Sequence, residues 1–242
     1  MVAIVKTGTT TLRCGGALIR PNFVLTTAYC ASLPNTSDTE VMVGNNNLTR
    51  ESPSIFAGVK EIRIHKGYDP QSRKNDIALL KLTYDLRIQQ PAVDIINIRE
   101  SAFPVTAICN LTGWGSRTWN GKSPGRLQRL ELSAVDYVIC SWILKQPIEV
   151  GQFCGGGKEG ENGCFLDEGD PLVCDGELAG IMSYSISCGI NNKPSVYTEV
   201  FKYRDWIDAT IESMNSAAAT SLSSCISTAM PVALVSYWKS RA

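Results

Sequence analysis

The sequence contains a single histidine, His65, and no surplus of charge of either sign. Lysine plus arginine number 23, and aspartate plus glutamate also number 23, so no long-range field favours nucleic acid or an anionic membrane. No residue spacing typical of metal ligands is present, and the sequence predicts neither a metal nor a cofactor. The apolar run at 231–238 is well short of the roughly 20 residues that span a bilayer. We therefore expect no nucleic-acid partner and no membrane span.

The first residues lack the features of a secretory leader. Residues 1–5 form a brief apolar run that Lys6 interrupts, whereas a leader needs a basic start, a longer apolar stretch and a small-residue cleavage site. Either a leader lies upstream of this chain, or the chain is cytosolic and its thiols are reduced. The nine cysteines favour the first alternative, because paired cysteines indicate an oxidising compartment. We expect a secreted, extracellular protein.

Short β-branched runs alternate with glycine, proline and asparagine along most of the chain. These runs predict strands at residues 17–19, 23–26, 41–43, 61–64, 77–82, 127–132, 178–182 and 196–200. Many short strands separated by turn signals are typical of a sandwich or a barrel. Helices are predicted near residues 135–144 and over about 201–214, the second because Trp206, Ile207, Thr210 and Ile211 share one face.

Residues 216–242 differ in composition from the rest of the chain. Small residues dominate 216–224, and the short apolar run after them ends in Lys239 and Arg241. A basic end is atypical of a cleaved lipid-anchor signal. We predict one domain over 1–215 and a low-complexity, disordered tail over 216–242. Cys225 in this tail is expected to be a free or variably oxidised thiol, with pairing between chains as the alternative.

Seven motifs in chain order resemble those of the trypsin/chymotrypsin-like serine peptidase family. They are CGGALI (14–19), LTTAYC (25–30), NDIALLKL (75–82), TGWG (112–115), PLVC (171–174), GIMSY (180–184) and KPSVYTEV (193–200). One such motif would be weak, but seven in the family's order are specific. The resemblance covers residues 1 to about 215, without the family's N-terminal activation segment. It implies an all-β fold of two six-stranded antiparallel β-barrels with a C-terminal helix, and a monomer.

The resemblance also implies how eight of the cysteines pair. The implied pairs are Cys14–Cys30, Cys109–Cys174, Cys140–Cys154 and Cys164–Cys188. Sequence alone leaves the connectivity open, because eight cysteines allow 105 pairings. Acceptor motifs for N-glycosylation occur at Asn35, Asn47 and Asn110, and we expect sugar on the first two, which fall on predicted loops.

The segment GCFLDEGDPLVC, residues 163–174, resembles the loop that carries the family's nucleophilic serine. The resemblance places the family's histidine, aspartate and serine at Tyr29, Asp76 and Glu168. A phenol with an unperturbed pKa near ~10 is a weak base, and a carboxylate has no hydroxyl with which to attack a carbonyl. His65 is expected on a surface turn away from the cleft. We therefore predict that the chain is not an enzyme, and that Asp76 accepts hydrogen bonds from Tyr29 and Ser183.

The resemblance places the specificity pocket and oxyanion loop at residues that also depart from the family pattern. These positions are Asn162, Tyr184, Ser185, Ser195 and Leu166. Asn162 replaces a pocket-floor aspartate, and the two serines narrow a slot that wall glycines leave open. The oxyanion donors would be the N–H groups of Leu166 and Glu168, and the Glu168 carboxylate competes for that space.

The resemblance also bears on Asp167, which in the family pairs with the ammonium of a freed N-terminus. The chain begins after that segment, so we expect Asp167 to lack this partner, with Arg13 as a candidate replacement cation.

Together these observations predict a secreted pseudoprotease that acts by binding protein, as a regulator, cofactor or decoy in a proteolytic or immune pathway. An alternative is an enzyme with residual or repurposed carboxylate chemistry around Asp76 and Glu168, beside Asp167 and Asp170. Against that alternative, the simpler expectation is that Glu168 fills the oxyanion space while Asp170 points to solvent. A third possibility, a failing gene product, is opposed by the ordered motifs.

Overall fold

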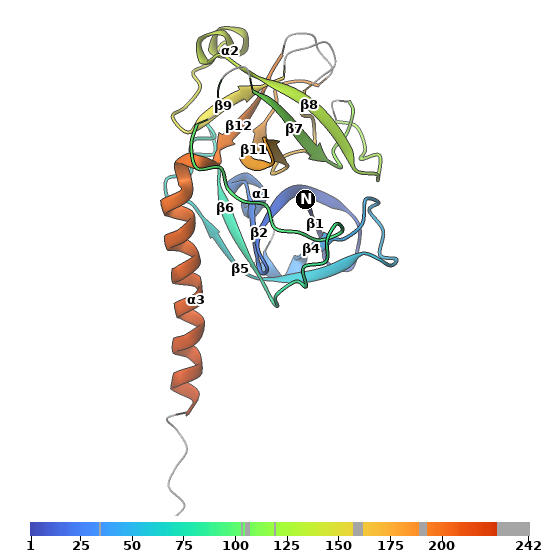
Figure 1. The fold of residues 1–242 in the computed structure, drawn as a ribbon, viewed down its shortest axis with the longest axis vertical. Coiled ribbons are helices and arrows are strands. Elements are labelled where there is room, and N and C mark those ends of the chain that lie inside the picture. The colour runs from blue at the N-terminus through green and yellow to red at the C-terminus, as the bar shows by residue number, and fades with distance from the viewer. Residues whose placement is uncertain are drawn as a thin grey trace, which may run out of the picture.

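The computed structural model describes residues 1–226 except 34, 103, 105, 106, 119, 157–161 and 189–192, and side chains as far as residue 216. Within this part of the chain the strands fall into two closed antiparallel barrels, which lie one above the other in Figure 1. The predicted all-β fold of two six-stranded barrels with a C-terminal helix is confirmed.

The N-terminal barrel is built from the first six strands, in the order β1-β2-β3-β6-β5-β4. Their bounds are β1 (Val2–Lys6), β2 (Leu12–Arg20), β3 (Phe23–Thr26), β4 (Thr39–Val43), β5 (Ile55–Ile64) and β6 (Ala78–Leu82). Closure pairs β1 with β4, so this sheet has no free edge at which another chain could add a strand.

The C-terminal barrel repeats this design in the order β10-β11-β12-β9-β8-β7. Its strands are β7 (Ile108–Gly113), β8 (Gln128–Val135), β9 (Gln152–Gly155), β10 (Pro171–Cys174), β11 (Glu177–Tyr184) and β12 (Ser195–Glu199). The pairing of β10 with β7 closes the barrel and sets Cys174 opposite Cys109.

Each barrel has its own apolar core, and a third cluster joins the two. In that cluster Ile19 and Leu79 of the first barrel pack with Leu178 and Ile181 of the second. Because apolar contact fixes the barrels against each other, loops from both can meet at one site between them.

Two short helices interrupt the barrel strands. The helix α1 (Ala28–Ser32) follows β3 and begins at Thr27, whose side chain accepts a hydrogen bond from the Cys30 N–H. The helix α2 (Tyr137–Leu144) lies close to the prediction, with Asp136 as its N-cap and Lys145 in the left-handed region at its end. A 3₁₀ turn, η1 (Thr36–Asp38), precedes β4.

The C-terminal helix is longer than the sequence predicted. It begins with the 3₁₀ turn η2 (Val200–Tyr203) and continues as α3 (Arg204–Ile226). The Lys81 ammonium donates to the Met214 carbonyl at 2.7 Å and to Asn215 Oδ1 at 2.9 Å, which ties α3 to β6. The helix passes the expected start of the disordered tail at residue 216, because the alanines at 217–219 favour helix.

The rest of the predicted tail, residues 227–242, lies outside the described part of the chain, as does the side chain of Cys225. No helix among the described residues is both long enough and apolar enough to cross a membrane.

The four cysteine pairs implied by the resemblance are all present as disulfides. They are Cys14–Cys30, Cys109–Cys174, Cys140–Cys154 and Cys164–Cys188. Asn35 and Asn47 are both exposed, and their glycosylation stays a prediction.

Candidate functional site

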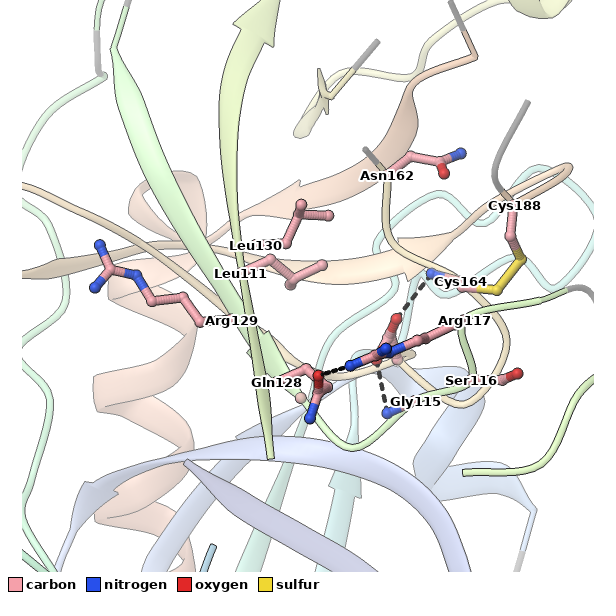
Figure 2. A pocket seen from close by; sticks show the side chains of 12 residues that line it. Leu111, Gly115, Ser116, Arg117, Gln128, Arg129, Leu130, Asn162, Cys164 and Cys188 are labelled. Atoms are coloured by element: carbon pink, nitrogen blue, oxygen red, sulfur yellow. Dashed lines mark hydrogen bonds between the residues drawn. A yellow bond between two sulfur atoms is a disulfide. The ribbon is translucent and has the colours of Figure 1, made fainter. Parts of the chain in front are cut away.

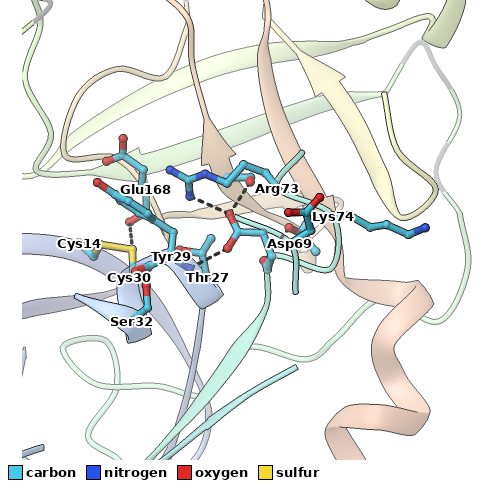
Figure 3. A network of polar contacts seen from close by, with 12 residues as sticks. Cys14, Thr27, Tyr29, Cys30, Ser32, Asp69, Arg73, Lys74 and Glu168 are labelled. Atoms are coloured by element: carbon cyan, nitrogen blue, oxygen red, sulfur yellow. Dashed lines mark hydrogen bonds and ion pairs between the residues drawn. A yellow bond between two sulfur atoms is a disulfide. The ribbon is translucent and has the colours of Figure 1, made fainter. Parts of the chain in front are cut away.

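Tyr29, Asp76 and Glu168 come from three separate segments and lie close together. Figure 3 shows Tyr29 and Glu168 side by side, next to Arg73. Tyr29 lies in α1, Asp76 just precedes β6, and Glu168 lies in the loop before β10. The closed first barrel supplies two of these residues and the second barrel supplies the other.

Asp76 is fully buried and is held by donors from both barrels. Its Oδ1 accepts from the Tyr29 N–H at 2.8 Å, and its Oδ2 accepts from the Ser183 hydroxyl at 2.5 Å. These are the two partners that the sequence predicted. Burial raises the pKa of Asp76, and the hydrogen bonds from Ser183 and Tyr29 oppose that rise.

Arg73 is a site residue that sequence reasoning missed. Its guanidinium lies 3.2 Å from Asp76 Oδ2 and stacks over the Tyr29 ring, 3.8 Å from the centroid. The turn that presents it is sharp, since Arg73 and Asn75 both have positive φ, at 56° and 53°. The available signal was a cation three residues before a buried aspartate. Arg73 therefore links Asp76 and Tyr29 through an ion pair and a cation–π contact.

Glu168 occupies the region predicted for the oxyanion donors. Its Oε2 accepts a hydrogen bond from the Leu166 N–H at 3.0 Å, so this donor is engaged by a side chain of its own loop. Burial raises the pKa of the Glu168 carboxyl. The loop is fixed to β2, because the Gly15 N–H donates to the Glu168 carbonyl at 2.8 Å.

The side chains of three predicted pocket residues, Asn162, Ser185 and Ser195, donate hydrogen bonds to backbone carbonyls of neighbouring residues. The Asn162 amide donates to the Ser187 and Lys193 carbonyls at 2.8 and 2.9 Å, and the Ser195 hydroxyl donates to the Gly163 carbonyl at 3.0 Å. The Ser185 hydroxyl donates to the Ser187 carbonyl at 2.6 Å.

The structure places two of the predicted binding residues at different hollows. Tyr184, whose hydroxyl accepts from Gln146 at 2.7 Å, borders a hollow of about 470 Å³ beside Arg73 and Ile186. Asn162 borders a second hollow, of about 350 Å³, beside Asp167 (Figure 2).

Comparison with known proteins agrees with this geometry. The family model described as trypsin matches residues 1–207. The chain belongs to the trypsin family. It is 35% identical over 213 residues to chymotrypsin-C of Bos taurus, covering 82% of this chain and 78% of that protein. It is 31% identical over 203 residues to trypsin-3 of Salmo salar, covering 83% of each.

A solved structure of neuropsin, a serine protease expressed in the limbic system of mouse brain, has the same fold. Its TM-score is 0.79 at 29% identity, covering 87% of this chain and 93% of that one.

The prediction that this trypsin-family chain is not an enzyme, with its catalytic histidine and serine replaced at Tyr29 and Glu168, is wrong by these comparisons. The relatives are trypsins and a chymotrypsin, and the solved structure is a serine protease. The prediction rested on single residue types, and the family match runs through nearly the whole described chain. The chemistry available to the site therefore depends on the side chains that lie together between the barrels, namely Tyr29, Arg73, Asp76 and Glu168.

His65 lies apart from these groups. It is half-buried and packs against the rings of Tyr203 and Trp206, with centroids 5.7 and 5.2 Å away. Burial lowers its pKa, which favours the neutral imidazole.

Asp167 is bound by backbone donors and borders the hollow of about 350 Å³. Its Oδ1 accepts from the Gly115 N–H at 2.9 Å and its Oδ2 from the Cys164 N–H at 2.8 Å. Arg13, the candidate cation for Asp167, instead pairs with Asp38. That expectation is wrong because Asp38, at the end of η1, lies within reach of the Arg13 guanidinium.

Asp170 was expected to point to solvent, and this expectation is also wrong. The residue is 1% exposed, and neither carboxyl oxygen accepts a hydrogen bond from an N–H or hydroxyl group of the described residues, while the Asp167 carboxyl lies beside it. The carboxyl fits only because two neighbours are glycines: a Cβ on Gly15 would lie 1.6 Å from Oδ1, and one on Gly113 would lie 1.5 Å from Oδ2.

Burial raises the pKa of Asp170 well above its ordinary value, and the charge of Asp167 raises it further. Attraction by the amino group of Met1 acts in the opposite direction and is the smallest cause. Among the described residues, no three His, Cys, Asp or Glu side chains are grouped so as to hold a metal ion.

Proposed function

We propose that this trypsin-family chain works outside the cell by binding a polypeptide segment of a partner protein at the cleft between its barrels. The observation that carries the proposal is the hollow of about 470 Å³ bordered by Arg73, Gln146, Glu149, Tyr184 and Ile186. Tyr184 and Ile186 offer an apolar contact, while the other three offer polar and charged groups at its rim. A segment with an apolar side chain between polar backbone groups fits this set.

The interior of the site is preorganised, which supports recognition. Asp76, Arg73 and Tyr29 hold one another in place, and the Leu166 N–H is engaged by Glu168. A surface that is already ordered loses little conformational freedom when it binds. Four disulfides support an oxidising, extracellular setting. In that setting the chain acts as a regulator, cofactor or decoy of a protease pathway, with sugar on Asn35 and Asn47.

Exchange of Ile186 for serine is expected to weaken peptide binding about tenfold, because the apolar contact beside Tyr184 is lost. Ile186 is 39% exposed, and Ile88, which is 37% exposed and borders no part of this hollow, provides a matched control as Ile88→Ser. Peptides would be selected from a display library against the oxidised protein. Dissociation constants would then be measured by fluorescence polarisation. Equal loss in the two variants, or no selectable peptide, would contradict the proposal.

A second candidate is hydrolysis of the bound peptide, which family membership favours. The raised pKa of the buried Glu168 carboxyl brings it closer to the range useful for acid–base catalysis at neutral pH. Mass spectrometry of the selected peptide after incubation separates the two functions. Cleavage that is lost in Glu168→Gln while the affinity stays unchanged assigns hydrolysis to this carboxyl. A peptide that is bound and recovered intact assigns binding.

A further inference from the structure

The helix α2 presents an apolar ridge to solvent. Val138 is 68% exposed, Ile139 is 54% exposed and Trp142 is 80% exposed, whereas Cys140 and Leu144 on the opposite side are buried. At 3.6 residues per turn, Trp142 lies directly above Val138 and Ile139, so the three side chains form one continuous strip. We call these three residues the α2 ridge. Figure 1 shows α2 projecting from the end of the C-terminal barrel that lies away from the N-terminal barrel.

A hollow lies directly beside the ridge. It has a volume of about 530 Å³ and is lined by Ser141, Trp142, Ile143 and Lys145. A projecting indole and a shallow apolar hollow thus lie on the same face. This is what a two-fold symmetric contact requires, since the same patch must supply both the knob and the hole.

The opposite charges at the two ends of α2 also favour contact with α2 of a second copy of the chain. Asp136 lies at the N-terminal end of α2, and exposed Lys145 lies at its C-terminal end. Neither side chain forms an ion pair within the described part of the chain. Two α2 helices that cross antiparallel about a two-fold axis bring Asp136 of each copy toward Lys145 of the other. The α2–α2 contact is therefore complementary in charge as well as in shape.

We propose that the α2 ridge is the contact surface of a weak homodimer in which the Trp142 side chain of each copy packs into the hollow of the other. This proposal differs from the predicted monomer. The ridge exposes roughly 400 Å² per chain, so two ridges would bury about 800 Å² in total, which is below the standard range of specific interfaces and typical of a weak, transient contact. For a contact of this size we expect a dissociation constant on the order of 10⁻⁵ M or weaker.

The dimer is tested by sedimentation equilibrium of the oxidised full chain from about 1 to 300 µM, a range that brackets the expected dissociation constant. The natural chain is expected to move from one to two chain masses. Trp142→Ser is expected to stay at one chain mass throughout, and Lys145→Glu is expected to raise the dissociation constant about fivefold. Leu33→Ser removes a 53% exposed leucine from the other barrel, and it is expected to dimerise like the natural chain.

Four outcomes would overturn the dimer. The first is a natural chain that remains at one chain mass over the whole range, and the second is dimerisation that Trp142→Ser leaves intact. The third is a monomeric chain that co-sediments with phosphatidylcholine vesicles only when Trp142 is present, which would assign the ridge to a lipid surface. Fluorescence quenching by acrylamide in the monomer, compared with Trp142→Phe, shows whether residues 227–242 of the same chain cover the indole instead. Protection of Trp142 in the monomer would also overturn the proposal.

Discussion

Replacement of Asp170 by asparagine is expected to raise the free energy of unfolding by about 3 kcal/mol at pH 8, because it removes a buried charge that lies beside Asp167. The side chain is fully buried beside the Asp167 carboxyl, and neither oxygen accepts a hydrogen bond from an N–H or hydroxyl group of the described residues. Charging this group in the folded chain is therefore costly, whereas an amide of the same shape carries no charge. Glycine at positions 15 and 113 leaves room for either side chain.

The gain in the free energy of unfolding that Asp170→Asn brings should increase with pH. Because the folded-state pKa of Asp170 is raised above that of the unfolded chain, the folded natural chain binds more protons in the window between the two values. The contribution of Asp170 to the free energy of unfolding is then fully present below the ordinary aspartate pKa. It is lost as the pH rises from that value through the raised pKa of the folded chain. Asp170→Asn removes this loss, so its advantage should vanish near pH 3.5 and grow toward pH 8.

Urea unfolding between pH 3.5 and 8 measures this effect. The exposed Asp85 supplies a control, Asp85→Asn, which should follow the pH profile of the natural chain. Some slope will remain in Asp170→Asn, because burial also raises the pKa of Asp76, Asp167 and Glu168. An Asp170→Asn profile parallel to that of the natural chain would show that Asp170 carries no buried charge cost.

The second large effect is expected from the Cys109–Cys174 bridge. Conversion of both cysteines to alanine should lower the free energy of unfolding by about 4 kcal/mol, because the bridge closes a long loop in the unfolded chain. The sequence separation is 65 residues, and the bridge joins paired positions of β7 and β10 where the second barrel closes.

The Cys140–Cys154 bridge offers a comparison within the same barrel. Its sequence separation is 14 residues, so its removal should cost about 3 kcal/mol, close to 1 kcal/mol less than loss of the longer loop. Both double variants would be unfolded in urea under oxidising conditions, so that the other three bridges stay intact. If removal of the Cys140–Cys154 bridge lowers the free energy of unfolding more than removal of the Cys109–Cys174 bridge, the effect comes from packing around the sulfurs rather than from loop closure.

The fold could be predicted from ordered motifs and from β-branched runs such as residues 23–26 and 196–200, which became β3 and β12. The strands predicted from the sequence do not include β1, β7, β9 or β10. β9 and β10 are four-residue segments that contain glycine, proline or cysteine, and their strand form comes from pairing within a closed barrel. The length of α3 was also missed, because low complexity was interpreted as disorder although alanine favours helix.

A residue of the site could be predicted from the sequence only when it lies within a single recognisable motif. The sequence singled out Tyr29, Asp76 and Glu168 because each lies inside a recognisable run, and the two-barrel fold brings them together. Arg73 was missed because its role depends on a ring from α1, more than forty positions earlier in the sequence. The burial of Asp170 was missed because its cavity is made by Gly15 and Gly113, which lie on β2 and β7.

The contact between Lys81 and α3 affects the order in which the fold is completed during synthesis. Residues of β6 are made early, but the partners of the Lys81 ammonium, the Met214 carbonyl and Asn215 Oδ1, are made much later. The apolar cluster that joins the barrels likewise includes Ile207 and Met214 of α3. The first barrel therefore leaves the ribosome with this face uncovered, and it is completed only when the last helix arrives. A nascent chain stopped before residue 204 would expose that face and a lysine without its acceptors, which makes it a natural target for chaperones.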